Sequence, residues 1–307
     1  MINSKDTKSF WAIMYMLIAM FSLSTMDAFA KLLVKGAYDP LQILAIRSWI
    51  ILAVLLLYYF SRKQLVQLKA NRLIPQLLRG GVGFLAPYCF FKSLQSLPLA
   101  DATIIFFSST FMITALSWPL LREKVGVYRW SAVVIGFIGV LIAMDPQGGG
   151  DKLSYLYCLF GSFCYSLLFL SGRYLSKTES VVSLVFFFNL SMAIVSTSLA
   201  PLVWVPVATA DYLSILMFSV LGLLGHFCVT KAFSISDVGL ITPLEYTALI
   251  WAVLWGYLLW GEVPQVNVWI GAGIIVLCAL FVIYRESVNK KRALRAANKI
   301  AVNSESV

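Results

Sequence analysis

Two stretches, LREKVGVYRWSAVVIGFIGVLIAMDP (121–146) and WGEVPQVNVWIGAGIIVLCALFVIY (260–284), decide how this chain folds. Each begins with a short polar segment and continues as an apolar run, 128–144 in the first and 267–284 in the second. Runs of this length approach the ~20 apolar residues that an α-helix needs to cross a bilayer core. The two stretches therefore predict membrane-spanning helices that follow similar polar segments.

Further runs of the same kind fill the rest of the chain. They are too long and continuous for membrane β-strands, which alternate over about ten residues, and the first is too long for a signal peptide. We expect ten transmembrane helices, at 11–33, 41–60, 76–95, 99–121, 128–144, 154–175, 181–203, 212–234, 238–260 and 267–284. The chain is thus predicted to be an all-α membrane protein.

Composition and charge agree with this prediction. Hydrophobic residues make up 60% of the 307 residues and charged residues only 12%, whereas soluble domains have about 45–50% and 25%. The net charge of +10 is not a nucleic-acid signal, because Lys and Arg lie in short loops and a basic tail. Nineteen of these residues fall on one side of the predicted topology, Arg47 lies in a span, and four fall on the other side: Lys31, Lys35, Lys92 and Lys152. This asymmetry predicts an inner-membrane protein with both termini in the cytoplasm.

An internal repeat divides the chain into halves. A shift of 139 residues brings 83–130 onto 222–269 and aligns Gly83 with Gly222, Cys89 with Cys228, Lys92 with Lys231, Thr103 with Thr242, Glu123 with Glu262 and Trp130 with Trp269. Because each half has five expected spans, the second half is inverted relative to the first. The expected organisation is a repeat at 1–145, a linker at 146–152, an inverted repeat at 153–284 and a basic cytoplasmic tail at 285–307. The linker is rich in glycine, and we expect the end of the tail to be disordered.

Glu245 is the foremost candidate for substrate binding, because charges deep in a span are costly and are commonly functional. It follows Pro243 in the ninth span, where proline removes a backbone hydrogen bond and frees carbonyls to line a cavity. Its carboxyl could exchange a proton or meet a cationic substrate, or it could bond a neighbouring helix for structure alone.

Four other deep polar residues are candidates. Asp27 and Lys31 are one turn apart and can pair, either as a structural couple or in contact with substrate. Arg47 could bind an anionic group through its planar fork or pair with Asp27. His226 could relay a proton or serve as a hydrogen-bonded link between helices.

Aromatic residues within the spans complete the candidate site. Tyr88, Tyr165, Tyr246 and Trp251 could stack on a planar or cationic substrate, although helix packing and interfacial belts explain any single one of them better. The repeat-related Lys92, Lys231, Glu123 and Glu262 lie at span ends, so we assign them to the fold. Gly136 and Gly139 permit close helix contact, including a homodimer contact; monomer and homodimer are both left open.

Cofactors are not expected. The five cysteines lie singly in apolar runs and the chain has one histidine, which excludes a multi-histidine metal site. Phosphate-loop and dinucleotide motifs are absent, so transport would be secondary. Membrane lipid is the expected surrounding of the helices and, through the basic tail, a contact.

The two stretches quoted first resemble the EamA-type branch of the drug/metabolite transporter superfamily, in which each half places a Glu after its fourth helix and then enters a Gly-rich fifth helix. Arg122 stands where that family often has the glycine found at Gly261. STMDAFAKLL (24–33) and LAIRSWI (44–50) look like the subgroup with S-adenosylmethionine and riboflavin transporters. The resemblance implies ten helices and a central substrate cavity among helices 1–4 and 6–9.

The leading hypothesis is a secondary transporter of a small organic metabolite, working by alternating access between inverted repeats, with proton coupling or exchange as options. Export of amino acids or drugs is an alternative. An intramembrane lipid-modifying enzyme would need a nucleophile–base or metal constellation that we do not find. A membrane sensor or scaffold stays open as a third class. Two deep acids beside two deep bases would suit a zwitterion or a polar aromatic substrate.

Overall fold

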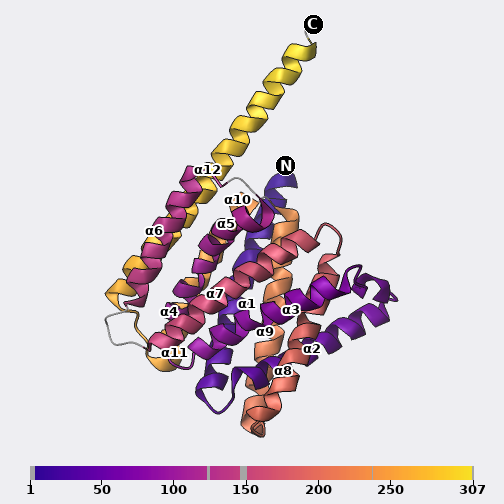
Figure 1. Ribbon diagram of the computed structural model, residues 1–307, viewed down its shortest axis with the longest axis vertical. Helices are drawn as coiled ribbons and strands as arrows, with labels where there is room; N and C mark the ends of the chain where they lie inside the picture. The colour runs from indigo at the N-terminus through magenta and orange to yellow at the C-terminus, as the bar shows by residue number, and fades with distance from the viewer. Residues whose placement is uncertain (1–3, 123–124, 146–150, 237, 306–307) are drawn as a thin grey trace.

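The computed structural model describes residues 4–122, 125–145, 151–236 and 238–305, and in this part of the chain it contains helices and no strand (Figure 1). Eight of the expected spans are single helices: α1 (Ser4–Lys35), α2 (Pro40–Ser61), α3 (Leu73–Ser93), α6 (Val127–Met144), α7 (Lys152–Leu175), α8 (Val181–Leu199), α9 (Tyr212–Ile235) and α12 (Val266–Glu305). Short 3₁₀ turns, η1 (Leu65–Leu68), η2 (Ala200–Leu202) and η3 (Thr209–Asp211), lie in the connections.

Eight of the described helical segments are long and apolar enough to cross a membrane. They correspond to all the expected spans except the third and the ninth. The third is α3, whose apolar run is interrupted by Gln76, Arg79 and Lys92. The ninth is divided into shorter helical pieces and is not among the eight.

The fourth and ninth spans are both broken, and at related places. The fourth consists of α4 (Leu99–Phe106) and α5 (Ser108–Leu121); the ninth consists of α10 (Val238–Ile241), the 3₁₀ turn η4 (Thr242–Tyr246) and α11 (Thr247–Trp260). Proline at the start of η4 accounts for the break in the ninth span. The 139-residue shift found in the sequence carries the bounds of α5 onto those of α11.

The two helices also end in the same way. Arg122 after α5 has φ 56°, and Gly261 after α11 has φ 66°, so both are left-handed caps. Glycine adopts this conformation freely, whereas an L-residue with a Cβ is strained in it. The backbone therefore makes the same turn at both positions, although Arg122 carries a Cβ and Gly261 does not.

The long helices pack mainly against helices of the other half. α1 lies along α9, α3 along α7, α2 along α8 and α6 along α12 (Figure 1). The backbones of α6 and α12 approach each other closely. A Cβ added at Gly271 would lie only 2.5 Å from the carbonyl oxygen of Gly139. Gly136 faces the ring of Phe111. Both glycines considered for a homodimer contact are therefore covered within this chain.

Both termini lie at the same end of the bundle (Figure 1). The opposite end, called here the distal end, carries the connections 36–39, 94–98, 200–211 and 261–265. The tail expected to end in disorder continues α12 as helix to Glu305, and its sequence, KKRALRAANK at 290–299, is rich in good helix formers. Glu123 and most of the expected linker lie outside the described residues.

Candidate functional site

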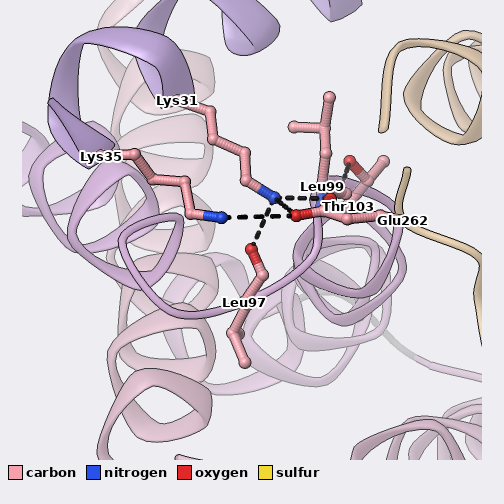
Figure 2. Close-up of polar contacts among 6 residues, drawn as sticks. All are labelled: Lys31, Lys35, Leu97, Leu99, Thr103 and Glu262. Atoms are coloured by element: carbon pink, nitrogen blue, oxygen red, sulfur yellow. Dashed lines mark hydrogen bonds and ion pairs between the residues drawn. The ribbon is translucent and has the colours of Figure 1, made fainter. Parts of the chain in front are cut away.

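Lys31 lies near the distal end of α1 and is fully buried. Its Nζ donates to the two carboxylate oxygens of Glu262 at 2.5 and 2.6 Å and to the carbonyl oxygen of Leu97 at 2.9 Å (Figure 2). The indole ring of Trp260 lies 4.8 Å from the same ammonium. With these acceptors around it, Lys31 has no donor left for a substrate in this state, and its expected pairing with Asp27 is replaced by the pair with Glu262.

Glu262, which the sequence assigned to the fold, gathers several elements at the distal end. It also accepts a hydrogen bond from the backbone N–H of Leu99, at the start of α4, at 3.0 Å. The ammonium of Lys35 lies 3.7 Å from its carboxylate (Figure 2). The sequence alone does not reveal the pair of Lys31 with Glu262, because the two residues are far apart in the chain. The third acceptor of Lys31 is the backbone carbonyl of Leu97, which side-chain patterns do not indicate.

Further contacts hold the distal end together. Lys92 pairs with Asp39 at 3.0 Å. The hydroxyl of Tyr38 donates to Asp211 at 2.7 Å and accepts from the backbone N–H of Ala208 at 3.0 Å. Gln42 exchanges two hydrogen bonds with the backbone of Val205. The bonds of Tyr38 and Gln42 tie the first half to the connection 200–211 of the second half, whereas Lys92 and Asp39 both belong to the first half.

Arg47 on α2 forms the first candidate substrate-binding group, together with residues of α1 and α9. Its side chain is 5% exposed, and its guanidinium lies over the ring of Phe218 at 5.0 Å. Asp27 and His226 interact with it electrostatically, but its Nε has no hydrogen-bond partner among the described residues. Gly222 provides the space, because a Cβ there would lie 2.7 Å from Arg47 Nη2.

A buried donor without a partner is costly. Such a group is expected to find its partner in a ligand or in another state of the protein. A planar guanidinium with free donors suits a carboxylate or a phosphate. Asp27 is partly buried, whereas the His226 side chain is exposed.

Glu245 in η4 forms the second group. It precedes Tyr246 in the sequence, and it interacts electrostatically with the phenols of Tyr246 and Tyr165. Among the residues that the structure describes, its carboxylate takes part in no hydrogen bond or ion pair. The phenol ring of Tyr165 lies 5.3 Å from the ring of Phe106, and that of Tyr246 lies 5.0 Å from the ring of Phe107.

The two remaining aromatic candidates pack against apolar neighbours. Tyr88 stacks on Phe84 of its own helix at 5.6 Å. Trp251 meets Phe21 of α1 edge to face at 4.9 Å. The structure thus brings Tyr165 and Tyr246 to Glu245, and records contacts of Tyr88 and Trp251 that the packing of helices explains.

Metal-binding groups are not found in the described part of the chain, where no three His, Cys, Asp or Glu side chains cluster. Cys89, Cys158, Cys164 and Cys228 are buried and Cys278 is partly buried, each as a free thiol.

Comparisons with known proteins bear on this arrangement. The model of the EamA-like transporter family matches residues 10–144 and 152–284. The S-adenosylmethionine uptake transporter of Rickettsia conorii is 28% identical over 80% of this chain and 82% of its own length. The pseudopaline exporter of Pseudomonas aeruginosa is 28% identical over 87% of this chain and 94% of its own. The riboflavin transporter of Vibrio cholerae is 29% identical over 64% and 66%.

A solved crystal structure superposes with a TM-score of 0.59 at 19% identity, covering 91% of this chain and 96% of the other. At that identity the likeness concerns the fold alone. The related proteins are named as transporters and not as enzymes. This multi-pass membrane protein belongs to the EamA-like transporter family.

Proposed function

We propose that the chain is a secondary transporter that moves a small organic metabolite across the inner membrane by alternating access between two inverted five-helix repeats, with both termini in the cytoplasm. The observation that carries the proposal is the presence of two charged groups, Arg47 and Glu245, inside the helical bundle without hydrogen-bond partners among the described residues. Charges so placed are costly, and a transported ligand gives them a role.

The repeat architecture is supported by three observations. If the two halves are interchanged, the pair α1–α9 becomes the pair α7–α3, and the structure contains both of these packed pairs. The bounds of α5 and α11 agree at one shift, and the family model matches twice, within 10–144 and 152–284. Halves related by inversion can open to opposite sides by exchanging conformations, with the substrate held between them. We take 1–145 and 153–284 as these repeats.

The two groups suggest the chemistry of the substrate. Lys31 is neutralised by Glu262, which leaves Asp27 near Arg47 and leaves Glu245 without a counter-charge. The free donors of Arg47 suit a carboxylate. Glu245 beside the rings of Tyr165 and Tyr246 suits an organic cation. We therefore propose a zwitterionic metabolite with a cationic centre, which could meet the two groups at once.

Among the names of the relatives, S-adenosylmethionine fits this chemistry, because it carries a carboxylate, an ammonium and a sulfonium. Riboflavin is uncharged near neutral pH and would leave both groups unpaired. Export is the second candidate, supported by the resemblance to the pseudopaline exporter over 94% of that protein. The residues of the site serve either direction equally.

Glu245 is also our candidate for proton coupling, since a carboxylate without a counter-charge can take up a proton when the cation leaves. Lipid surrounds the helices in this proposal. A monomer suffices for it, because the two groups lie within one chain; a homodimer is equally compatible.

The test is a thermal-shift screen of the purified protein against S-adenosylmethionine, riboflavin, amino acids and nucleosides. A ligand that binds the folded state raises the melting temperature by mass action. We expect a shift with S-adenosylmethionine or a chemically similar compound, lost in Glu245→Gln and in Arg47→Met but kept in Asp151→Asn, an exposed carboxylate that caps α7. Equal shifts in wild type and Glu245→Gln would contradict the proposed site.

A further inference from the structure

We propose that Lys31 and Glu262 form a latch that closes the distal end of the bundle, and that Asp27 is the partner which takes over Lys31 when the latch opens. The inference rests on the proposed function, because it describes one of the two gates that alternating access requires. It adds residues with a defined conformational role to a site defined so far by Arg47 and Glu245.

The latch joins the two halves of the chain. Lys31 belongs to α1, Leu97 lies in the connection before the fourth span and Leu99 at the start of that span, all in the first half. Glu262 follows α11 in the second half and binds Lys31 and the backbone N–H of Leu99 (Figure 2). Separation of the halves at this end must break all of these contacts together. Lys92 and Asp39, by contrast, pair within the first half.

The burial of the partners makes the latch unequal on its two sides. The Lys31 side chain has no exposed surface, whereas 17% of the Glu262 side chain is exposed. A buried ammonium without a partner is strongly unfavourable. The need of the buried Lys31 ammonium for an acceptor therefore stabilises the closed state. An open state must offer this ammonium another acceptor.

Lys31 has a second acid within reach. Asp27 is one turn before it on α1, the spacing at which side chains of opposite charge meet on a helix. Lys35 lies 3.7 Å from Glu262 but belongs to the same helix as Lys31, so its contact with Glu262 must also break when this end opens. In the open state Lys31 pairs with Asp27, and the partly exposed carboxylate of Glu262 meets water, so that the buried ammonium keeps a partner.

This exchange links the latch to the substrate site. In the closed structure Asp27 is the acid that interacts with Arg47. A substrate carboxylate that binds Arg47 replaces this interaction and frees Asp27 for Lys31. Binding at Arg47 therefore favours opening at the distal end, as linkage requires of a ligand that prefers one of two states.

The experiment measures the distance between spin labels at Ala37 and Val263 by double electron–electron resonance. Both positions are exposed, at the distal end and in different halves, and the five native cysteines are replaced by alanine. We expect one short distance in the parent protein and an added longer population in Glu262→Gln and Lys31→Met. Lys31→Arg, which keeps the charge and the donors, should stay closed.

Two variants separate the latch from a general loss of charge or of structure. Lys92→Met removes an equivalent ammonium from a pair within one half, and it should leave the distance unchanged. Adding Asp27→Asn to Glu262→Gln should reduce the longer population, because Lys31 then loses the acid one turn away on its own helix. A longer population in Lys92→Met equal to that in Glu262→Gln, or none in Glu262→Gln, would overturn the proposal.

The measurement needs no substrate. An unchanged distance in Glu262→Gln refutes the latch and leaves the proposed function standing. A responsive distance together with an absence of transport for every metabolite tested refutes the proposed function and not the closure itself. Melting temperatures of all variants identify any that fail to fold. Because Glu262→Gln and Lys31→Met each break the latch, either one that folds decides the question by comparison with Lys92→Met.

Discussion

Replacing Arg122 by glycine should stabilise the protein. Arg122 adopts φ 56° and ψ 31° at the end of α5, and its repeat counterpart Gly261 adopts φ 66° and ψ 20°. The left-handed conformation costs a residue with a Cβ about 1–2 kcal/mol. Glycine removes this cost but adds about 0.4–1 kcal/mol of unfolded-state entropy. The Arg122 side chain is exposed, so its loss removes little packing, and we expect a net gain of about 0.5–1 kcal/mol.

The assay is thermal unfolding in detergent, followed by tryptophan fluorescence. For a protein of this size, about 2 °C accompanies each kcal/mol, so Arg122→Gly should raise the melting temperature by about 1–2 °C. Gly261→Ala is the matched reverse change and should lower the melting temperature, because it places a Cβ on a residue with positive φ. No atom lies within 4 Å of that Cβ, so a steric clash would not explain the loss. A lower melting temperature in Arg122→Gly, or no loss in Gly261→Ala, would refute the argument from backbone strain.

Other substitutions test the packing and the distal end. Gly271→Ala should destabilise the α6–α12 contact by about 1–3 kcal/mol, since its Cβ would lie 2.5 Å from the Gly139 oxygen; Gly273→Ala on the same helix meets nothing within 4 Å and should be neutral or stabilising in the same melting assay. Tyr38→Phe removes a donor to Asp211 and an acceptor for a backbone N–H. It should cost about 1–2 kcal/mol and speed limited proteolysis within 203–211; an unchanged cleavage rate would show that these bonds do not hold the loop.

The sequence predicted much of the fold because lipid imposes a simple length rule and the repeat supplies a register. The 139-residue shift, found from residues such as Lys92, Cys89 and Trp130, also relates helix bounds and a left-handed cap. The break in the ninth span followed from Pro243. The break at Phe107 had no such local signal, because neither a proline nor a glycine stands there.

The candidate site was less accessible to sequence reasoning. Helical spacing predicts that Asp27 and Lys31 share one face, but it cannot reveal that Glu262, far along the chain, binds the ammonium of Lys31. Glu262 was assigned to the fold because it repeats between the halves. A residue that occurs at equivalent positions in both halves can nevertheless have a role in only one of them. Glu262 has such a role because it meets a partner, Lys31.

Arg47 illustrates what a pattern does and does not determine. A deep arginine was recognised as costly, and the structure adds that a glycine at 222 makes room for it and that its Nε has no partner in the described part of the chain. The contact with the Phe218 ring arises from the packing of α2 on α9. Such contacts between distant segments depend on how helices cross, which periodicity alone does not specify.

The most direct test of the account is uptake of labelled S-adenosylmethionine, or of another zwitterion with a cationic centre identified by the thermal screen, into proteoliposomes that contain the purified protein. The account predicts uptake above that of protein-free liposomes. It predicts a fall of about 10–100-fold in Glu245→Gln and Arg47→Met, the loss expected when a charged hydrogen bond of about 1.5–3 kcal/mol is removed, with Asp151→Asn unaffected. Uptake that is unchanged in both site variants, or that never exceeds the protein-free control for any compound of this class, would contradict it.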